Sequence, residues 1–307
     1  MDLTIVSTLY RSAPHLREFY ARVSHAAAAI TPHYEIVLVN DGSPDESLGV
    51  ARQLVESDPR VRVVDLARNF GHHKAMMTGL SYAGGSRVFL IDCDLEEDPE
   101  LLAEFDQRMQ ASGADVVYGV QAQRRGDMVE RLSGWLFFAS FNALSPHELP
   151  ANVLTVRLMT RRYVEALLRH QERETIIAGL WAITGFEQLA VTVAKHARNS
   201  TTYSLRRKVA ILVNSVTSFS DAPLVMVFYL GLGISLLAIA AAAYLLVRRL
   251  FFGVLLAGWP SLIVSVWLLG GLTLFCLGIL GIYLSKIFIE TKQRPYTIVR
   301  DVYERRE

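Results

Sequence analysis

Residues 87–98 read RVFLIDCDLEED, an apolar run that ends in a cluster of acids. The run up to Ile91 has the length and continuity of a strand that is buried on both faces. Asp92 and Asp94 follow at once, and alternate residues that leave a strand can aim two carboxylates at one point. The stretch therefore predicts a buried parallel strand with an acidic site at its carboxyl end.

Similar apolar runs lie on both sides of this one in the sequence. They predict further strands at 3–9, 34–40, 61–66 and 115–118, and helices near 13–30, 45–57, 72–83 and from 99 onward. Strands that alternate with helices, and that are apolar throughout, indicate an α/β fold with a mostly parallel sheet covered on both faces. Ligands of such sheets bind beyond the carboxyl ends of the strands.

Polar residues follow three of the predicted strands. Thr8 and Tyr10 end the first run, Asp41 ends the second, and Asp92 ends the run quoted above. We expect these side chains to converge, because the carboxyl ends of parallel strands meet at one sheet edge. Asp41 could contact a nucleobase or ribose. Its Asp-Gly-Ser context is equally ordinary turn chemistry.

The acids at 92–98 allow two interpretations. Their oxygens suit a hard divalent cation, Mg²⁺ or Mn²⁺, which commonly shares such ligands with substrate phosphates. The same acids could instead cap the next helix, since Asp98-Pro99-Glu100 is a good helix start. Both interpretations hold together if Asp98 caps the helix while Asp92, Asp94 and Glu96 bind the metal.

Basic residues close to these strands are candidates for binding an anionic donor. Arg68 and His72 flank a predicted helix start, where backbone N–H groups favour an anion. A solvated basic cap is the alternative for this cluster. Arg157 lies in an otherwise apolar stretch, which predicts a carboxylate or phosphate partner and a place in catalysis.

The apolar excess of the chain lies near its C-terminus. Of the 307 residues 51% are hydrophobic, which excludes a disordered protein. No charged residue occurs in Ala222–Val247 or in Leu250–Ser285. Because a membrane span needs roughly 20 apolar residues, two transmembrane helices are predicted at about 222–247 and 260–286. Two buried helices of a soluble core are the alternative.

The flanking charges predict a multi-pass protein of the inner (plasma) membrane with its catalytic domain and both termini in the cytoplasm. No signal peptide is expected, since Asp2 comes early. Basic residues at 206–208 and 286–300 outnumber Arg248 and Arg249 of the outer loop, which favours cytoplasmic ends. The net charge of +1 offers no field for nucleic acid, so no nucleic-acid partner is predicted.

Four segments are therefore predicted: a domain at 1–200, an amphipathic juxtamembrane helix at 201–221, the transmembrane pair at 222–289 and a cytoplasmic tail at 290–307. Apolar residues recur on one helical face of the second segment, at Leu205, Val209, Leu212, Val216 and Phe219. A helix that lies on a lipid bilayer explains this face. A helix packed on the globular domain would explain it too.

Several motifs, in order, resemble the polyprenyl-phosphate glycosyltransferases of glycosyltransferase family 2. They are IVSTLY, YEIVLVNDGSPD, LARNFGHHKAMMTGL, VFLIDCDLEEDPELL, DVVYGV, TSFSDAPL and GILGIYLSKIFIETKQRPYTIV. The group includes dolichol-phosphate mannose synthases and bacterial undecaprenyl-phosphate sugar transferases. The resemblance implies a GT-A fold, a nucleotide-sugar donor, and a metal-dependent, inverting transfer of a sugar to a polyprenyl phosphate.

The resemblance also implies roles for individual positions. The nucleoside pocket would be lined by Thr8, Tyr10 and Asp41. The family's DxDxQ metal site would correspond to Asp92, Asp94 and Glu96, with Glu in place of Gln. The family's phosphate-binding arginines would correspond to Arg124, Arg125 and Arg131.

This sequence departs from the family pattern at several positions. Thr155 stands where an acidic residue, often proposed as the base, is expected. An acceptor phosphate with a second pKa of about 6 is already a nucleophile at neutral pH, so the missing acid need not abolish activity. Two alternatives stay open: a processive polysaccharide synthase and a non-catalytic membrane scaffold. The sequence does not decide between a monomer and a homo-oligomer.

Overall fold

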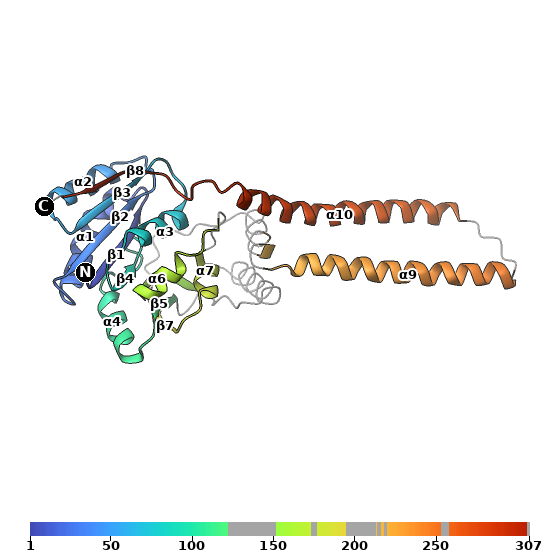
Figure 1. The fold of residues 1–307 in the computed structure, drawn as a ribbon, viewed down its shortest axis with the longest axis horizontal. Helices are drawn as coiled ribbons and strands as arrows, with labels where there is room; N and C mark the ends of the chain where they lie inside the picture. The colour runs from blue at the N-terminus through green and yellow to red at the C-terminus, as the bar shows by residue number, and fades with distance from the viewer. Residues whose placement is uncertain are drawn as a thin grey trace. The chain divides into compact units, whose positions relative to one another are not determined.

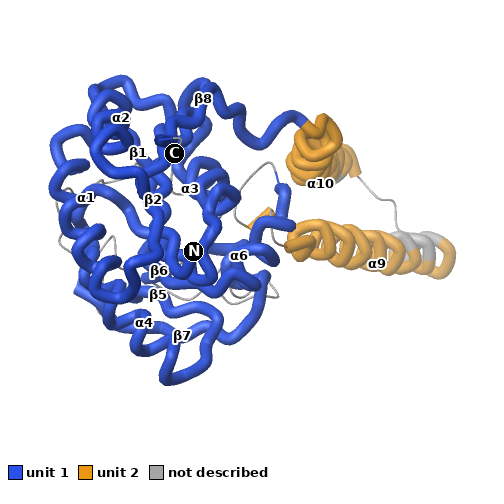
Figure 2. The backbone as a smooth tube through the Cα atoms, turned by 60° about the vertical axis from the view of Figure 1, so that its left-hand side comes forward, with its two compact units in different colours: residues 1–138, 147–204, 294–307 blue, residues 139–146, 205–293 orange. Residues whose placement is uncertain are grey.

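The structure is a computed structural model that describes residues 1–121, 152–172, 177–194, 213, 216–217, 220–252 and 258–305. The chain forms two compact units, coloured separately in Figure 2. Unit 1 comprises residues 1–138, 147–204 and 294–307, and unit 2 comprises residues 139–146 and 205–293. The predicted amphipathic helix at 201–221 falls mostly outside the described residues.

Unit 1 is built on one eight-stranded sheet in its described part, with the order β7-β5-β6-β4-β1-β2-β3-β8. The strands are β1 (Leu3–Leu9), β2 (Tyr34–Asn40), β3 (Val61–Leu66), β4 (Arg87–Leu90), β5 (Val116–Gln121), β6 (Val153–Thr160), β7 (Gln188–Val193) and β8 (Val299–Glu304). The first five correspond to the five predicted strands.

Most of the sheet is parallel. β1 pairs in parallel with β2 and β4, β2 pairs in parallel with β3, and β5 pairs in parallel with β7. Three pairings are antiparallel: β4 with β6, β5 with β6, and β3 with β8. The predicted α/β fold of the GT-A type, with a mostly parallel sheet, is thereby confirmed.

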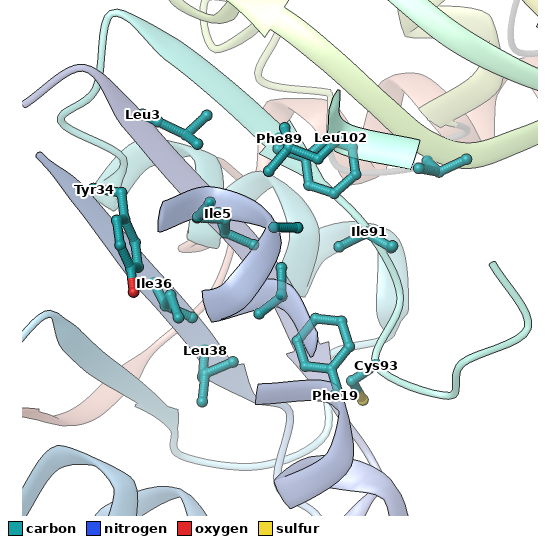
Figure 3. Packing of buried hydrophobic residues seen from close by; sticks show 14 of the residues in the cluster. Leu3, Ile5, Phe19, Tyr34, Ile36, Leu38, Phe89, Ile91, Cys93 and Leu102 are labelled. Atoms are coloured by element: carbon teal, nitrogen blue, oxygen red, sulfur yellow. The ribbon is translucent and has the colours of Figure 1, made fainter. Parts of the chain in front are cut away.

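One face of the sheet carries the main apolar core. Figure 3 shows side chains of β1, β2 and β4 packed together with Phe19 and Leu102. The helices on this face are α1 (Ala13–Ala28), α2 (Ser47–Ser57) and α4 (Leu101–Ser112). Each buries a set of apolar residues against the sheet, and removing this apolar area from water stabilises the packing.

The opposite face packs against α3 (His72–Tyr82), which contacts β1 and β2. Gly79 allows this close approach, because a Cβ there would lie 2.5 Å from a methyl group of Val6 and 2.8 Å from one of Val39. Two short helices complete the described part of unit 1: α6 (Arg161–Leu167) and α7 (Ile177–Ile183). The first turn of α3 is thereby brought to the carboxyl edge of the central strands.

The chain returns to unit 1 after its apolar C-terminal region. The predicted tail at 290–307 contains β8, which lies beside β3 at the edge of the sheet (Figure 1). Sequence analysis assigned no strand to this segment, nor to β6 or β7. Valine and tyrosine are interspersed with charged residues in β8, and Arg300, Asp301 and Glu304 are exposed, as expected of an edge strand.

Unit 2 contains α9 (Ala222–Phe252) and α10 (Trp259–Thr291). Their segments Ala222–Ala241 and Leu262–Thr291 are long and apolar enough to span a membrane, and both are unburied. The Tyr283 hydroxyl, near the end of α10, donates a hydrogen bond of 2.7 Å to the carbonyl of Ser220, just before α9. The two helices therefore run antiparallel.

Candidate active site

The candidate site lies at the carboxyl ends of β1, β2 and β4, which are neighbours in the sheet. Thr8 is next to last in β1, Asp41 directly follows β2, and Asp92 comes two residues after β4. The parallel registers Thr8↔Val39 and Val6↔Leu90 bring these ends to the same level. The predicted convergence of the three strand ends is therefore observed.

His72, the first residue of α3, links two of these strand ends. Its Nδ1 lies 3.0 Å from the Thr8 hydroxyl, and its Nε2 lies 3.4 Å from a carboxylate oxygen of Asp92. Burial lowers the pKa of His72, but the hydrogen bond that its ring donates to Asp92 and the charges of Asp92, Asp41 and Asp94 outweigh it, so the pKa is raised. The nearby carboxylates therefore favour the protonated form of the ring.

Asp41 holds the loop that leads into α3. Its carboxylate is buried and accepts hydrogen bonds from the backbone N–H groups of Phe70, at 2.7 Å, and Gly71, at 3.0 Å. The guanidinium of Arg68 stacks over the Phe70 ring at 3.9 Å. Both oxygens of Asp41 are used within the protein, so its observed role is to shape the loop. A contact to a nucleoside stays a prediction.

A second turn of the site follows β1. Tyr10 is 48% exposed, and the guanidinium of Arg11 lies 5.7 Å from the centre of its ring. Arg11 has φ +57°, a left-handed conformation that is uncommon for a residue with a side chain. Its N–H donates to the Ser43 hydroxyl at 2.7 Å. The turns after β1 and β2 are thus joined, with an aromatic ring exposed at their edge.

Cys93 fixes the acidic loop that follows β4. The Cys93 thiol donates to the carbonyl of Thr8 at 3.1 Å. Burial raises the pKa of this thiol to about 12, so it stays protonated and unreactive. Asp94 accepts the N–H of Glu96 at 3.0 Å, across Leu95 with its left-handed φ of +59°. The thiol thus sets the position of a loop that carries Asp92 and Asp94 on either side of it.

One prediction about this loop is wrong. Helix α4 begins at Leu101 with Glu100 at its N-cap position, so Asp98 is not the capping residue. The Asp98 carboxylate instead lies 2.8 Å from the guanidinium of Arg22 on α1. Arg22 also forms an ion pair with Glu100. Asp98 and Glu100 are therefore both paired with Arg22.

The donor set at the site fits a divalent cation that is shared with a substrate. In the described residues no three His, Cys, Asp or Glu side chains form a ready-made metal cluster. Mg²⁺ characteristically takes only one or two protein carboxylates and completes its shell with phosphate and water oxygens. The Asp92 side chain is 24% exposed and Asp94 is exposed, so both can supply such oxygens.

Arg157 lies in β6 and is 1% exposed. It donates to the carbonyls of Thr155 and Leu154, and its guanidinium stacks on the Trp181 ring. Burial lowers its pKa to about 9, against the opposing effects of Tyr163, Tyr118 and Glu97. Among the described residues its hydrogen bonds go to carbonyl oxygens, while the buried carboxylate of Glu97 is the acidic group that acts on its charge. Its catalytic role stays a prediction.

The described residues do not include every predicted position. Arg124, Arg125 and Arg131 lie outside them. Two residues that sequence reasoning did not single out act at the site. Cys93 ties the acidic loop to β1, and Asp45 gathers the turns after β1 and β2. The alternation of the strand could have identified Cys93, because it lies between two acids that face the other way.

The fold and this edge of the sheet define a class of protein. A GT-A sheet that presents two aspartates after a central strand, with a histidine against one of them, indicates a glycosyltransferase. A family model described as glycosyl transferase family 2 matches residues 4–172, more than half of the chain. The chain belongs to this family, and it is an enzyme.

Relatives match nearly the full length. A Mycobacterium tuberculosis (strain CDC 1551 / Oshkosh) protein named "Putative glycosyltransferases" is 55% identical over 303 residues, covering 99% of this chain and 89% of the relative. The "Prophage bactoprenol glucosyl transferase homolog" of Escherichia coli (strain K12) is 30% identical over 305 residues, covering 98% of this chain and 99% of the relative.

One solved structure aligns with part of the chain. Mannosyl-3-phosphoglycerate synthase from Rubrobacter xylanophilus aligns with a TM-score of 0.49 and 19% identity. The alignment covers 71% of this chain and 73% of that structure.

Proposed function

We propose that the chain transfers a single sugar from a nucleotide-sugar donor to a polyprenyl phosphate in the inner (plasma) membrane, with inversion at the sugar carbon. The observation that carries this proposal is a GT-A carboxylate site in the same chain as two unburied, membrane-length apolar helices. The bactoprenol glucosyl transferase homolog matches both parts, since its alignment covers 98% of the chain. Glucose is therefore the first sugar to test.

The acceptor activates itself in the proposed reaction. A phosphomonoester with a second pKa of about 6 is mostly dianionic at neutral pH. One of its oxygens attacks the anomeric carbon, the bond from that carbon to the donor diphosphate breaks, and the nucleoside diphosphate leaves with the electron pair. No proton has to be removed from the nucleophile, so Thr155 at the position of a family acid is compatible with activity.

The protein would stabilise the charge that develops on the departing diphosphate. Asp92 and Asp94 would hold a Mg²⁺ or Mn²⁺ ion, and such an ion neutralises charge on phosphoryl oxygens. His72 would position the Asp92 carboxylate through the contact at 3.4 Å, and would add positive charge there when its ring is protonated. Preorganised charges of this kind commonly account for the largest share of catalysis.

The loop after β3 would receive the anionic donor. Asp41 fixes the N–H groups of Phe70 and Gly71 in place, directly before the start of α3. Arg68 is part of the same loop and is exposed. Thr8 and the exposed ring of Tyr10 would form the nucleoside end of the pocket. Glu96 would support the metal ligands, and Arg124, Arg125 and Arg131 would bind phosphate.

The domain division predicted from the sequence is kept in this proposal, with one addition. Residues 1–200 would carry the transfer reaction in the cytoplasm, and residues 222–289 would span the bilayer. Residues 294–307 belong to unit 1 through β8 rather than to a separate tail.

The test uses the purified full-length chain in detergent with undecaprenyl phosphate. UDP-glucose, GDP-mannose and UDP-galactose are supplied in turn with Mn²⁺ or Mg²⁺, and lipid products are identified by mass spectrometry. We expect one hexose per lipid phosphate, and no product after the metal is removed with EDTA. A polymeric product would favour the processive synthase. Absence of any product with every sugar donor would contradict the proposal.

A further inference from the structure

The C-terminal strand begins beside the proposed donor loop. Residues 292–298 connect α10 to β8, and the antiparallel register pairs Val299 with Leu66, the last residue of β3. Figure 1 shows β8 running along β3 at this edge. The segment that precedes the strand therefore reaches the loop at 67–71 and the helix that follows it.

Two hydrogen bonds join the C-terminal residues to Ala67, the first residue of the loop. The N–H of Ala67 donates to the carbonyl of Ile298 at 2.8 Å. The guanidinium of Arg300 donates to the carbonyl of Ala67 at 2.7 Å. Ala67 is held on both sides, directly before Arg68. The path of the donor loop is thus set at one end by Asp41 and at the other by the C-terminal segment.

Two further contacts reach α3. The hydroxyls of Thr297 and Thr78 lie 2.8 Å apart, and the Lys74 ammonium lies 5.6 Å from the centre of the Tyr296 ring. Lys74 and Thr78 lie one turn apart on a helix whose first residue is His72. The segment therefore holds the element that carries the histidine of the site.

A third connection passes through buried polar groups. Arg300 lies 3.5 Å from the carboxylate of Asp65, which is 1% exposed. The other oxygen of Asp65 accepts a hydrogen bond from the side-chain amide of Asn40 at 2.7 Å. The side-chain oxygen of Asn40 in turn accepts the backbone N–H of Ser43 at 3.3 Å. Arg300 thus connects to the turn after β2 as well as to the loop after β3.

We propose that residues 296–300 form a C-terminal strap whose side chains position the donor-binding loop, with Arg300 and Thr297 as its positioning residues. This inference rests on the proposed function, because it takes the loop at 67–72 as the donor site. All its contacts lie within unit 1 and on one edge of the sheet. The strap fixes the loop before a donor arrives, and this preorganisation lowers the cost of binding.

The test measures the dissociation constants of UDP and of GDP, each with Mn²⁺, by calorimetry on the full-length chain in detergent. We expect Arg300→Ala and Thr297→Val each to weaken binding of the nucleotide that the wild type binds by about fivefold or more. Thr297→Ser should restore wild-type binding, because it keeps the hydroxyl. In transfer assays the same variants should raise the donor KM more than they lower kcat.

Glu304→Ala is the matched control. Glu304 also joins β8 to β3, through an ion pair with Arg62 at 2.8 Å, but at the opposite end of the strand. Its nucleotide affinity should stay within twofold of wild type. Equal affinities for Arg300→Ala, Thr297→Val and Glu304→Ala would overturn the strap. Losses of nucleotide affinity that only parallel the losses in melting temperature would also overturn it.

The outcomes separate this inference from the proposed function. A wild-type chain that binds a nucleotide but makes no lipid-linked sugar contradicts the proposed function, and the affinities alone then decide the strap. A wild-type chain that binds neither UDP nor GDP overturns both.

Discussion

Asp45 shows how single residues build the site. Its carboxylate accepts hydrogen bonds from the hydroxyls of Ser43, at 2.5 Å, and Ser47, at 2.6 Å. It also accepts the backbone N–H groups of Ser47 and Ala13, both at 3.2 Å. Burial would raise the pKa of Asp45, but these hydrogen bonds lower it to about 2. Asp45 therefore ties the starts of α1 and α2 together.

Asp45→Asn should destabilise the protein in a pH-dependent way. Because the folded pKa lies below the ordinary value, the ionised carboxylate stabilises the folded state above about pH 4, and this contribution is lost as pH falls toward 2. We expect a loss of about 1–2 kcal/mol at pH 7. Thermal unfolding in detergent at pH 7 and pH 3 measures it.

The exposed Asp301 of β8 offers a control of the same chemistry. Asp301→Asn should change the melting temperature little at either pH. A deficit for Asp45→Asn that is equally large at pH 3 and pH 7 would show that the charge of Asp45 is not what stabilises the turn.

Sequence identified some residues of the site but not their connections. Thr8, Asp41 and Asp92 could be named because they end apolar strands, and strand ends converge in a parallel sheet. The use of Asp41 to hold Phe70 and Gly71 depends on how a loop folds over from the next strand. The aromatic partner of Arg157, Trp181, comes from a helix outside its own strand. Such contacts between distant segments leave no local pattern.

At the scale of elements, α3 decides the geometry of the site. It packs against β1 and β2 at Gly79 and delivers His72 to Thr8 and Asp92. Alanine normally favours a helix over glycine by about 1 kcal/mol. At Gly79 the added methyl group would collide with the side chains of Val6 and Val39.

Gly79→Ala should therefore destabilise the protein, by about 1–3 kcal/mol, because the clash outweighs the gain in helix propensity. It should also lower activity, since α3 must shift away from the strand ends. Thermal unfolding and transfer assays measure the two effects. Ser81→Ala, on the exposed side of the same helix, is the control and should be nearly neutral. A more stable Gly79→Ala would contradict the close packing of α3 on the sheet.

Elements were predictable where their sequence carried one clear period. β1 to β5 are apolar runs, and the helices between them follow from the spacing. β6 escaped prediction because Arg157 and two threonines interrupt its apolar pattern, and β8 because half of its residues are charged. The antiparallel pairing of β6 between β4 and β5 joins segments that are distant in sequence. Local periodicity does not specify such an order.

At the scale of the whole molecule, the distribution of apolar and charged residues predicted the two long helices of unit 2. The two charge-free runs predicted helices at about 222–247 and 260–286, and α9 and α10 contain these two spans. Both helices continue past the charges that end the runs, α9 through Arg248 and Arg249 and α10 through Lys286 and Glu290. The return of the chain from α10 to the sheet edge was not predicted, since β8 pairs with β3, a strand far from it in the sequence.

Membrane topology is open to direct measurement. We expect alkaline phosphatase to be active when it is fused after Phe252, at the end of α9, and inactive when it is fused after Glu307. Green fluorescent protein should give the opposite pattern, because phosphatase folds outside the cytoplasm and the fluorescent protein inside. The basic residues at 286–300 are the physical reason for a cytoplasmic C-terminus. Phosphatase activity at both junctions would contradict two spans.

The central claim is that Asp92 and Asp94 drive transfer of a sugar to a lipid phosphate, and Asp94→Asn tests it most directly. Asp98→Asn is the matched control, because Asp98 lies in the same acidic run but pairs with Arg22. The measurement is the rate of lipid-linked sugar formation by both variants and the wild type, at saturating Mn²⁺. We predict a loss of about 10²–10⁴-fold for Asp94→Asn and near wild-type rates for Asp98→Asn. Equal rates for all three proteins would contradict the account.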